Sequence, residues 1–315
     1  MEKTSRRRIS IITDIILFAI ISSIIFMLFN NYYKSDLSYS DDVNKILASD
    51  NLILEKREKS NIESENKMYI KNIKEEYGIK IKFGRDIEDF IQKVDAISQY
   101  DIYVINSNLK VIYEALEKYP NEVFDMTRTK KYPITIMLVD KFNNDNLALA
   151  SRNNLNEFSI YISNAKNFER AFHHEMYHLL EYYMSDTKKY LYASWKNFNP
   201  ENFTYEKDIS KLNNDYVYIA SNIAFSNEES LKKSDENIKN SSVSENEKNP
   251  YFVSKYSKVT EKEDRAEIFA ELMTMTRKPR YLGKEQNIRK KADFMTDTIK
   301  RNVTGSDFYY SKFLY

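Results

Sequence analysis

The sequence predicts an α+β fold in which a small mixed sheet is followed by helices, behind an N-terminal transmembrane helix. Stretches with strand-like patterns occur between residues 78 and 163, and stretches with apolar residues three and four positions apart follow them. No internal repeat is present. The chain has 315 residues, 42% of them hydrophobic, which is enough apolar material for a sizeable core. We therefore expect helices that pack on one sheet.

The N-terminal segment has the pattern of a membrane anchor. A basic cluster at residues 3–8 precedes an apolar run at residues 9–29, which is long enough to cross a bilayer as a helix. This order predicts a cytoplasmic basic tail at residues 1–8 and a signal anchor at residues 9–29. We expect a single-pass protein of the cell membrane with its C-terminal domain outside the cytoplasm. The alternative is a cleaved signal peptide and a secreted protein, but no A-x-A-like cleavage site follows the run.

Polar residues with a loose helical period follow at 30–75 and predict a partly helical stalk. We expect one folded domain at residues 76–315. Its strands are predicted from short apolar or alternating stretches, which lie at residues 78–84, 101–106, 133–140 and 157–163.

The helices of this domain are predicted from apolar spacing and from the residues at their ends. They lie at residues 109–120, 165–184, about 260–277 and 284–302. Ser163 or Asn164 is the expected N-cap of the second helix. Between the second and third helices, the polar stretch at about 227–250 predicts a mobile surface loop.

The composition excludes several classes of function. Cysteine is absent, which rules out disulfides, thiolate ligands and a catalytic thiol. The net charge of +1 argues against nucleic acid as a partner, because phosphate binding requires a clear basic excess. With 4 glycines, the chain also has no glycine-rich phosphate loop.

All 3 histidines occur within six positions, in the segment His173-His174-Glu175-Met176-Tyr177-His178. Residues four apart lie on one face of a helix, so His174 and His178 can present two imidazole nitrogens to one ion. Glu175 is rotated by about 100° and would lie beside the metal as a base. This is the H-E-x-x-H pattern of zinc hydrolases. We expect His173 to face solvent or to lie behind the ligands.

A surface helix that carries two histidines by chance is the alternative interpretation of this segment. The helix also has an apolar face typical of a packed helix, which counts against that alternative. The residues of this face are Phe168, Ala171, Phe172, Leu179 and Leu180.

The third metal ligand has to be a carboxylate, because the chain has no other histidine and no cysteine. The metzincin extension would need Gly and His where this chain has Glu181 and Met184. Glutamates at positions 263, 267 and 271 recur at four-residue intervals, and this spacing leaves open which one binds metal. The apolar residues between them predict a largely buried helix; they are Ala266, Ile268, Phe269, Ala270 and Leu272. A solvated charged stripe is the alternative. We expect one Zn²⁺ per chain, held by two histidines and one glutamate, with water in the fourth position.

Residues 256–269, YSKVTEKEDRAEIF, together with H-E-x-x-H resemble the anthrax lethal factor family of gluzincins, which includes the Pro-Pro endopeptidases. The resemblance covers roughly residues 100–183 and 250–280. It implies a zincin-like metallopeptidase domain with Glu263 as the third ligand and Glu267 as a carboxylate behind the ligands, or as the alternative ligand. It also implies that the Tyr256 hydroxyl supports the oxyanion. The toxin's translocation domain has no counterpart, so toxin activity is not implied.

The sequence therefore predicts a membrane-anchored, extracytoplasmic zinc endopeptidase in which Glu175 is the general base for a metal-activated water. Its expected partners are a protein or peptide substrate and, through residues 9–29, the membrane. The resemblance implies an extended substrate along a sheet edge, at residues 156–163 or 146–150. The alternatives are a non-catalytic, membrane-tethered zinc-containing binding or sensor module and a structural surface protein.

Overall fold

The computed structural model describes residues 54–144, 146–153, 155–165, 167–187, 191–207 and 249–315. Contacts divide the chain into two compact units, Met1–Asn61 and Ile62–Tyr315. The described part of the first unit, residues 54–61, is helical. All elements discussed below belong to the second unit.

The predicted placement in a membrane is corrected by the structure. Within residues 54–315, as far as they are described, no helix combines the length and the apolar character that crossing a bilayer requires. The predicted basic tail (1–8), the predicted anchor (9–29) and the beginning of the predicted stalk (30–53) lie outside the described residues. The prediction of a single-pass protein, with its C-terminal domain outside the cytoplasm, is withdrawn.

In the described residues, five strands form one mixed sheet, with the order β1-β3-β5-β4 and with β2 also paired to β3. The central strand β3 runs parallel to β1 and β5 and antiparallel to β2, whereas β4 runs antiparallel to β5. The strands are β1 (Lys80–Lys82), β2 (Ala96–Ser98), β3 (Ile134–Phe142), β4 (Ala148–Arg152) and β5 (Phe158–Ser163). The sequence analysis located β1, β3 and β5. It missed the short strand β2 and did not predict β4 as a strand, although it named residues 146–150 as a possible sheet edge.

The two faces of the sheet are buried unequally. One face carries the main core, formed from β3 and β5 by Ile134, Ile136, Leu138, Phe158, Ile160 and Ile162. The opposite face carries a small cluster formed by Ile87, Met137, Val139, Phe142 and Tyr161. Because alternate side chains of a strand point to opposite faces, the period-two pattern of residues 157–163 correctly predicted which residues face the main core.

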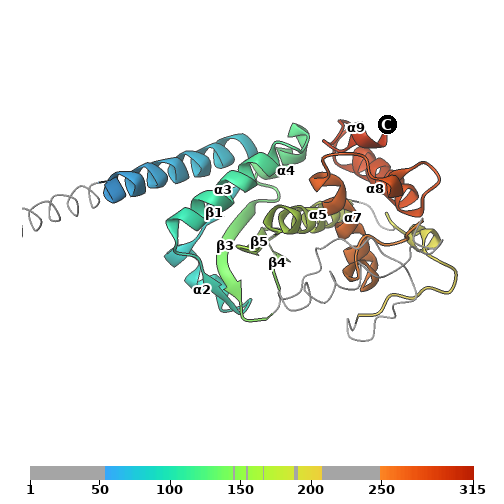
Figure 1. Cartoon of the computed structure of the whole chain (residues 1–315), viewed down its shortest axis with the longest axis horizontal. Coiled ribbons are helices and arrows are strands. Elements are labelled where there is room, and N and C mark those ends of the chain that lie inside the picture. The colour runs from blue at the N-terminus through green and yellow to red at the C-terminus, as the bar shows by residue number, and fades with distance from the viewer. Residues whose placement is uncertain (1–53, 145, 154, 166, 188–190, 208–248) are drawn as a thin grey trace, which may run out of the picture. The chain divides into compact units, whose positions relative to one another are not determined.

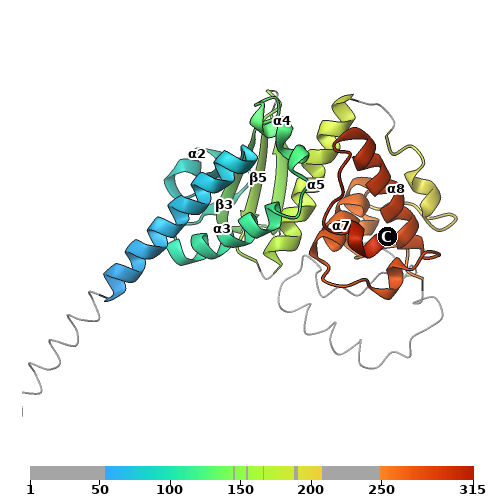
Figure 2. The ribbon, with the colours of Figure 1, turned by 90° about the horizontal axis from the view of Figure 1, so that it is seen from above.

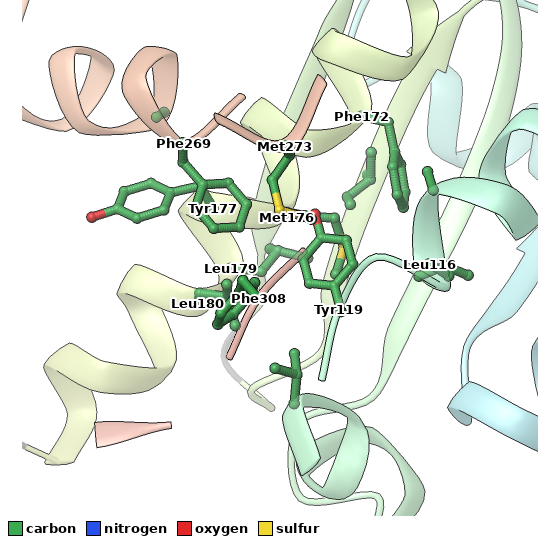
Figure 3. Packing of buried hydrophobic residues seen from close by; sticks show 14 of the residues in the cluster. Leu116, Tyr119, Phe172, Met176, Tyr177, Leu179, Leu180, Phe269, Met273 and Phe308 are labelled. Atoms are coloured by element: carbon green, nitrogen blue, oxygen red, sulfur yellow. The ribbon is translucent and has the colours of Figure 1, made fainter. Parts of the chain in front are cut away.

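Two helices, α3 (Ile102–Leu116) and α5 (Phe168–Thr187), cover the main core face of the sheet (Figures 1 and 2). Figure 3 shows their contact, where Leu116 at the end of α3 and Tyr119, which follows the helix, pack near Phe172 and Met176 of α5. The long helix α5 is thereby held against the sheet on one side.

Helices from the C-terminal part of the chain pack on the other side of α5. They include α7 (Glu261–Thr274), which lies along α5, and α8 (Asn287–Asn302), which packs on α7 (Figures 1 and 2). A short 3-10 helix, η3 (Trp195–Phe198), joins this layer, and its Trp195 is fully buried. Shorter elements complete the unit: η1 (Gly84–Ile87), α2 (Glu88–Ile91), η2 (Asn121–Phe124), α4 (Asp125–Arg128), η6 (Tyr256–Lys258), η7 (Arg280–Leu282) and α9 (Ser311–Leu314).

The predicted strand at residues 101–106 is wrong, because this segment is the first turn of α3. Asp101 caps the helix: its carboxylate accepts hydrogen bonds from the backbone N–H groups of Tyr103 and Val104, at 2.9 and 3.3 Å. Ile105 and Leu109 are buried four residues apart, as on one face of a helix. The β-branched residues favoured the strand prediction, and the N-cap outweighs them.

Other predicted boundaries shift by a few residues. Helix α5 begins at Phe168, so neither Ser163 nor Asn164 is its N-cap. Ser163 ends β5 instead, and its hydroxyl donates to the backbone carbonyl of Leu147. The predicted helices near 260–277 and 284–302 correspond to α7 and α8. Of the predicted loop at about 227–250, all but the last two residues lie outside the described part of the chain.

The compact unit that holds the sheet begins at Ile62, whereas the sequence analysis placed the start of the domain at residue 76. Residues 62–77 are helical, and Ile73 and Tyr77 belong to the main core. Gly78 ends this helix with a φ of +69°, and a Cβ there would come within 2.9 Å of the backbone nitrogen of Arg128. Glycine is therefore required at this turn.

Candidate metal centre

Three predicted ligands converge between α5 and α7. In the described residues, one ligand atom from each of His174, His178 and Glu263 lies within 4.8 Å of the others. The His174 Nε2 atom lies 2.9 Å from Glu263 Oε2 and 3.1 Å from His178 Nε2. The third side of this triangle, from His178 Nε2 to Glu263 Oε2, is 3.4 Å.

This triangle has the size that a zinc ion requires. Zinc binds imidazole nitrogen and carboxylate oxygen at about 2.0–2.1 Å, so two ligand atoms of a tetrahedral site lie about 3.3 Å apart. The observed separations of 2.9, 3.1 and 3.4 Å come within a few tenths of an ångström of that value. Two imidazoles and one carboxylate are also the donor set of hydrolytic zinc sites.

The two glutamates of α7 contact different nitrogens of the same ring. Glu263 faces Nε2 of His174, whereas Glu267 Oε1 lies 2.9 Å from Nδ1. Glu267 is fully buried and, in the described residues, is not part of the converging group. The geometry therefore distinguishes Glu263, which lies beside both imidazole Nε2 atoms, from Glu267, which lies beside Nδ1 of His174.

The charges around the two imidazoles favour a bound cation. Burial disfavours charge on His174, but the hydrogen bonds to Glu263 and Glu267 outweigh it and raise the pKa of this imidazole to about 10. The pKa of Glu263 is lowered, because the His174 and His178 rings outweigh its burial. A divalent cation can replace the protons that these groups otherwise share.

Glu175 lies beside the triangle and is 5% exposed. Burial raises the pKa of its carboxyl, while the nearby rings of His174 and His178 act in the opposite direction. The backbone N–H of Ala150 donates to the Glu175 carboxylate. This bond places the predicted base next to β4.

Among the described residues, strand β4 pairs with β5 alone, so it is an edge of the sheet, and it lies next to Glu175. Of the two edges predicted for an extended substrate, residues 156–163 are wrong, because β5 lies between β3 and β4. The other predicted segment, residues 146–150, overlaps β4.

Tyr256 also lies at the site. It belongs to η6, and its ring centroid is 5.9 Å from that of His174. Burial raises the pKa of its hydroxyl, and the neighbouring carboxylates of Glu263 and Glu175 raise it further, so the phenol stays protonated. The chain thus brings together all the site residues that the sequence analysis selected.

His173 is fully buried, which excludes the first of its two predicted positions, facing solvent. Its Nδ1 lies 2.7 Å from the Tyr119 hydroxyl, and its Nε2 lies 3.5 Å from a Glu169 oxygen. It therefore points away from the ligands. Because α5 is covered by the sheet on one side and α7 on the other, a residue rotated off the ligand face is still inside the protein.

Sequence reasoning missed Arg170, which lies one turn before His174 and is 4% exposed. Its guanidinium bonds both Glu267 and Glu271. The signal available in the sequence was an arginine four residues before a ligand histidine, with glutamates repeating every four residues on a second helix.

No protein-family model matches this sequence, and no curated protein matches it. Among solved structures, the chain is similar to a protein from Bacteroides caccae ATCC 43185 that is described as a proposed zinc-binding metallopeptidase. The two share 16% sequence identity with a TM-score of 0.45, over 79% of this chain and 89% of that chain. A likeness this distant carries no argument about activity, so the conclusions below rest on the geometry of the site.

Proposed function

We propose that this protein is a zinc-dependent endopeptidase. One observation carries the proposal: His174, His178 and Glu263 converge with the separations of zinc ligands, and the buried carboxylate of Glu175 lies beside them. A structural zinc site is closed by four protein ligands, whereas a hydrolytic site has three and leaves a position for water or substrate. A base next to the metal is useful only in the second kind of site.

In this proposal His174, His178 and Glu263 hold the zinc ion. A bound zinc ion would act as a Lewis acid toward water and the peptide carbonyl. Glu175 accepts the proton of the attacking water and passes it to the nitrogen of the leaving amine. The N–H of Ala150 keeps the Glu175 carboxylate in place while it does so.

Tyr256 is proposed to donate a hydrogen bond from its hydroxyl to the oxygen of the substrate's peptide carbonyl as negative charge develops there. Its support is its position beside His174 and the raised pKa of its phenol, which keeps the donor proton in place. Glu267 is proposed to hold the Nδ1 proton of His174, which leaves Nε2 free to bind metal.

The proposed substrate is an extended peptide paired with the free edge of β4. Two observations support this placement: in the described part of the chain β4 has one partner strand, and the Ala150 N–H reaches Glu175 from it. Backbone pairing of this kind gives affinity with little demand on sequence.

The decisive experiment compares the unaltered protein with Glu175→Gln, using metal analysis and a peptide library. Both proteins should bind one equivalent of zinc, and only the unaltered protein should release new peptide termini. Glu169→Gln, on the same helix but away from the ligands, is the control and should cleave normally. Zinc without cleavage in the unaltered protein would indicate a non-catalytic binding module, and neither zinc nor cleavage would indicate a structural protein.

A further inference from the structure

The buried guanidinium of Arg170 joins the two helices that carry the metal site. Arg170 belongs to α5, and its Nη2 donates to Glu267 Oε2 at 2.9 Å and to the Glu267 carbonyl oxygen at 3.3 Å. Its Nη1 donates to Glu271 Oε2 at 2.6 Å. One side chain of α5 therefore holds two successive carboxylates of α7.

The same carboxylate of Glu267 connects this guanidinium to a ligand. One oxygen of Glu267 accepts from Arg170, and the other faces Nδ1 of His174. With one oxygen fixed, the second has a defined position for the imidazole N–H. Arg170 and His174 lie four residues apart on one face of α5, so the three side chains form a closed loop between the helices.

We infer that Arg170 is a positioning residue for the proposed zinc site and acts on His174 through Glu267. The inference rests on the proposed function and extends it to a residue that touches neither metal nor substrate. Its physical basis is that a ligand histidine is oriented by the partner of its second nitrogen, and that partner is oriented in turn by its own bonds. The planar guanidinium suits this role because it bonds two carboxylates in fixed directions.

A second buried ion pair between the same helices provides a matched control. Arg265 of α7 lies 2.5 Å from Glu181 of α5, and their side chains are 5% and 7% exposed. This pair also joins α5 to α7. In the described residues, its hydrogen bonds and ion pairs include neither His174 nor Glu267. Its loss should disturb helix packing without disturbing the ligand.

The test measures zinc affinity of the full chain by competition with a chelator, together with the visible spectrum of the cobalt-substituted protein. Arg170→Met should bind zinc about 10-fold more weakly and should shift the cobalt bands. Arg265→Met should lower the melting temperature while its affinity and spectrum match the unaltered protein. Equal losses of affinity in both variants would show that Arg170 is only a helix clamp and would overturn the inference.

A double variant tests the route through Glu267. In the Glu267→Gln background, Arg170→Met should cause little further loss of affinity, because its target is already altered. Independent, additive losses would overturn the proposed route. If Arg170→Met does not fold, Arg170→Lys replaces it: lysine lacks the fork and should also weaken zinc binding, and unchanged affinity would overturn the inference.

The outcomes also separate this inference from the proposed function. An unaltered protein that binds no zinc would overturn both. If the unaltered protein binds zinc and Arg170→Met binds it equally tightly, the role of Arg170 is overturned and the proposed function is not.

Discussion

His174 has a different acidic partner on each ring nitrogen, and this arrangement distinguishes the two glutamates of α7. Glu263 lies 2.9 Å from Nε2, and Glu267 lies 2.9 Å from Nδ1. Spacing along the sequence could not decide between them, since both occupy the same helical face. The direction of the imidazole ring decides, and packing between two helices sets that direction.

We predict that Glu263→Ala loses zinc far more than Glu271→Ala. Loss of a group that hydrogen-bonds a ligand weakens metal binding by about 10–100-fold. Loss of a ligand itself should weaken zinc binding by more than this. Chelator competition measures both variants, with the melting temperature as a check on folding. If Glu267→Ala loses zinc and Glu263→Ala retains it, the third ligand is one turn further along α7.

A second residue-scale prediction concerns Glu169 at low pH. The His173 ring and then the Lys118 ammonium outweigh burial and lower the pKa of Glu169 to about 2, from an ordinary value of 4.5. A depressed carboxyl pKa stabilises the fold above the unfolded value, and this stabilisation is lost as the pH falls through the folded value. Glu169 should therefore stabilise the protein at neutral pH and cease to do so in acid.

Urea unfolding of the chelator-treated protein tests this prediction against Glu169→Gln. The difference in unfolding free energy between the two should narrow as the pH falls from about 5 to about 2. Chelation removes any contribution from acid release of metal. A difference that stays constant over this range would contradict the assignment.

At the scale of elements, the first two turns of α7 are tied to several neighbours at once. Asp264 follows the proposed ligand Glu263, is fully buried, and accepts three bonds at Oδ2. The donors are the Trp195 indole at 3.0 Å, the Tyr205 hydroxyl at 2.8 Å and the Lys291 ammonium at 2.7 Å. These bonds fix the turn that presents Glu263.

We predict that Lys291→Met destabilises the protein by about 3–5 kcal/mol, because it leaves the buried Asp264 charge without its partner. Lys300→Met on the same helix is the control. Its ion pair with Asp307 lies at the surface, with the Lys300 side chain 28% and the Asp307 side chain 64% exposed, so the loss should be below about 1 kcal/mol. Urea unfolding measures both variants, and equal losses would show that the buried pair contributes no more than a surface pair.

Element prediction succeeded where local pattern and packing agree. The strand predicted from the alternation of residues 157–163 corresponds to β5. The helix predicted from apolar spacing around the histidines corresponds to α5. The prediction failed at residues 101–106, because the apolar β-branched residues there favour a strand although Asp101 caps a helix. Burial agrees with the cap, since Ile105, Leu109 and Ile112 are buried at the four- and three-residue spacing of a helix.

At the scale of the molecule, the proposed zinc ion joins α5 to α7 and should stabilise the whole unit. A ligand that binds only the native state stabilises it by about 2.7 kcal/mol at 100 times its dissociation constant. We predict a higher melting temperature with zinc than with a chelator, measured by circular dichroism. His178→Ala should remove most of this difference, and an unaltered protein with no difference would contradict a native-state metal site.

The sequence by itself determined the chemistry available to this protein: two histidines one helical turn apart, a glutamate beside them, and carboxylates as the remaining donors in a chain without cysteine. Covalent spacing on one helix is sufficient for that inference, because helix geometry is local. Only the tertiary structure decided which glutamate faces both imidazole Nε2 atoms, that His173 is buried, that β4 is the edge beside Glu175, and that Arg170 lies behind the site. Each of these depends on how α5 packs against a sheet and a second helix distant in sequence, and spacing within one segment does not encode that packing.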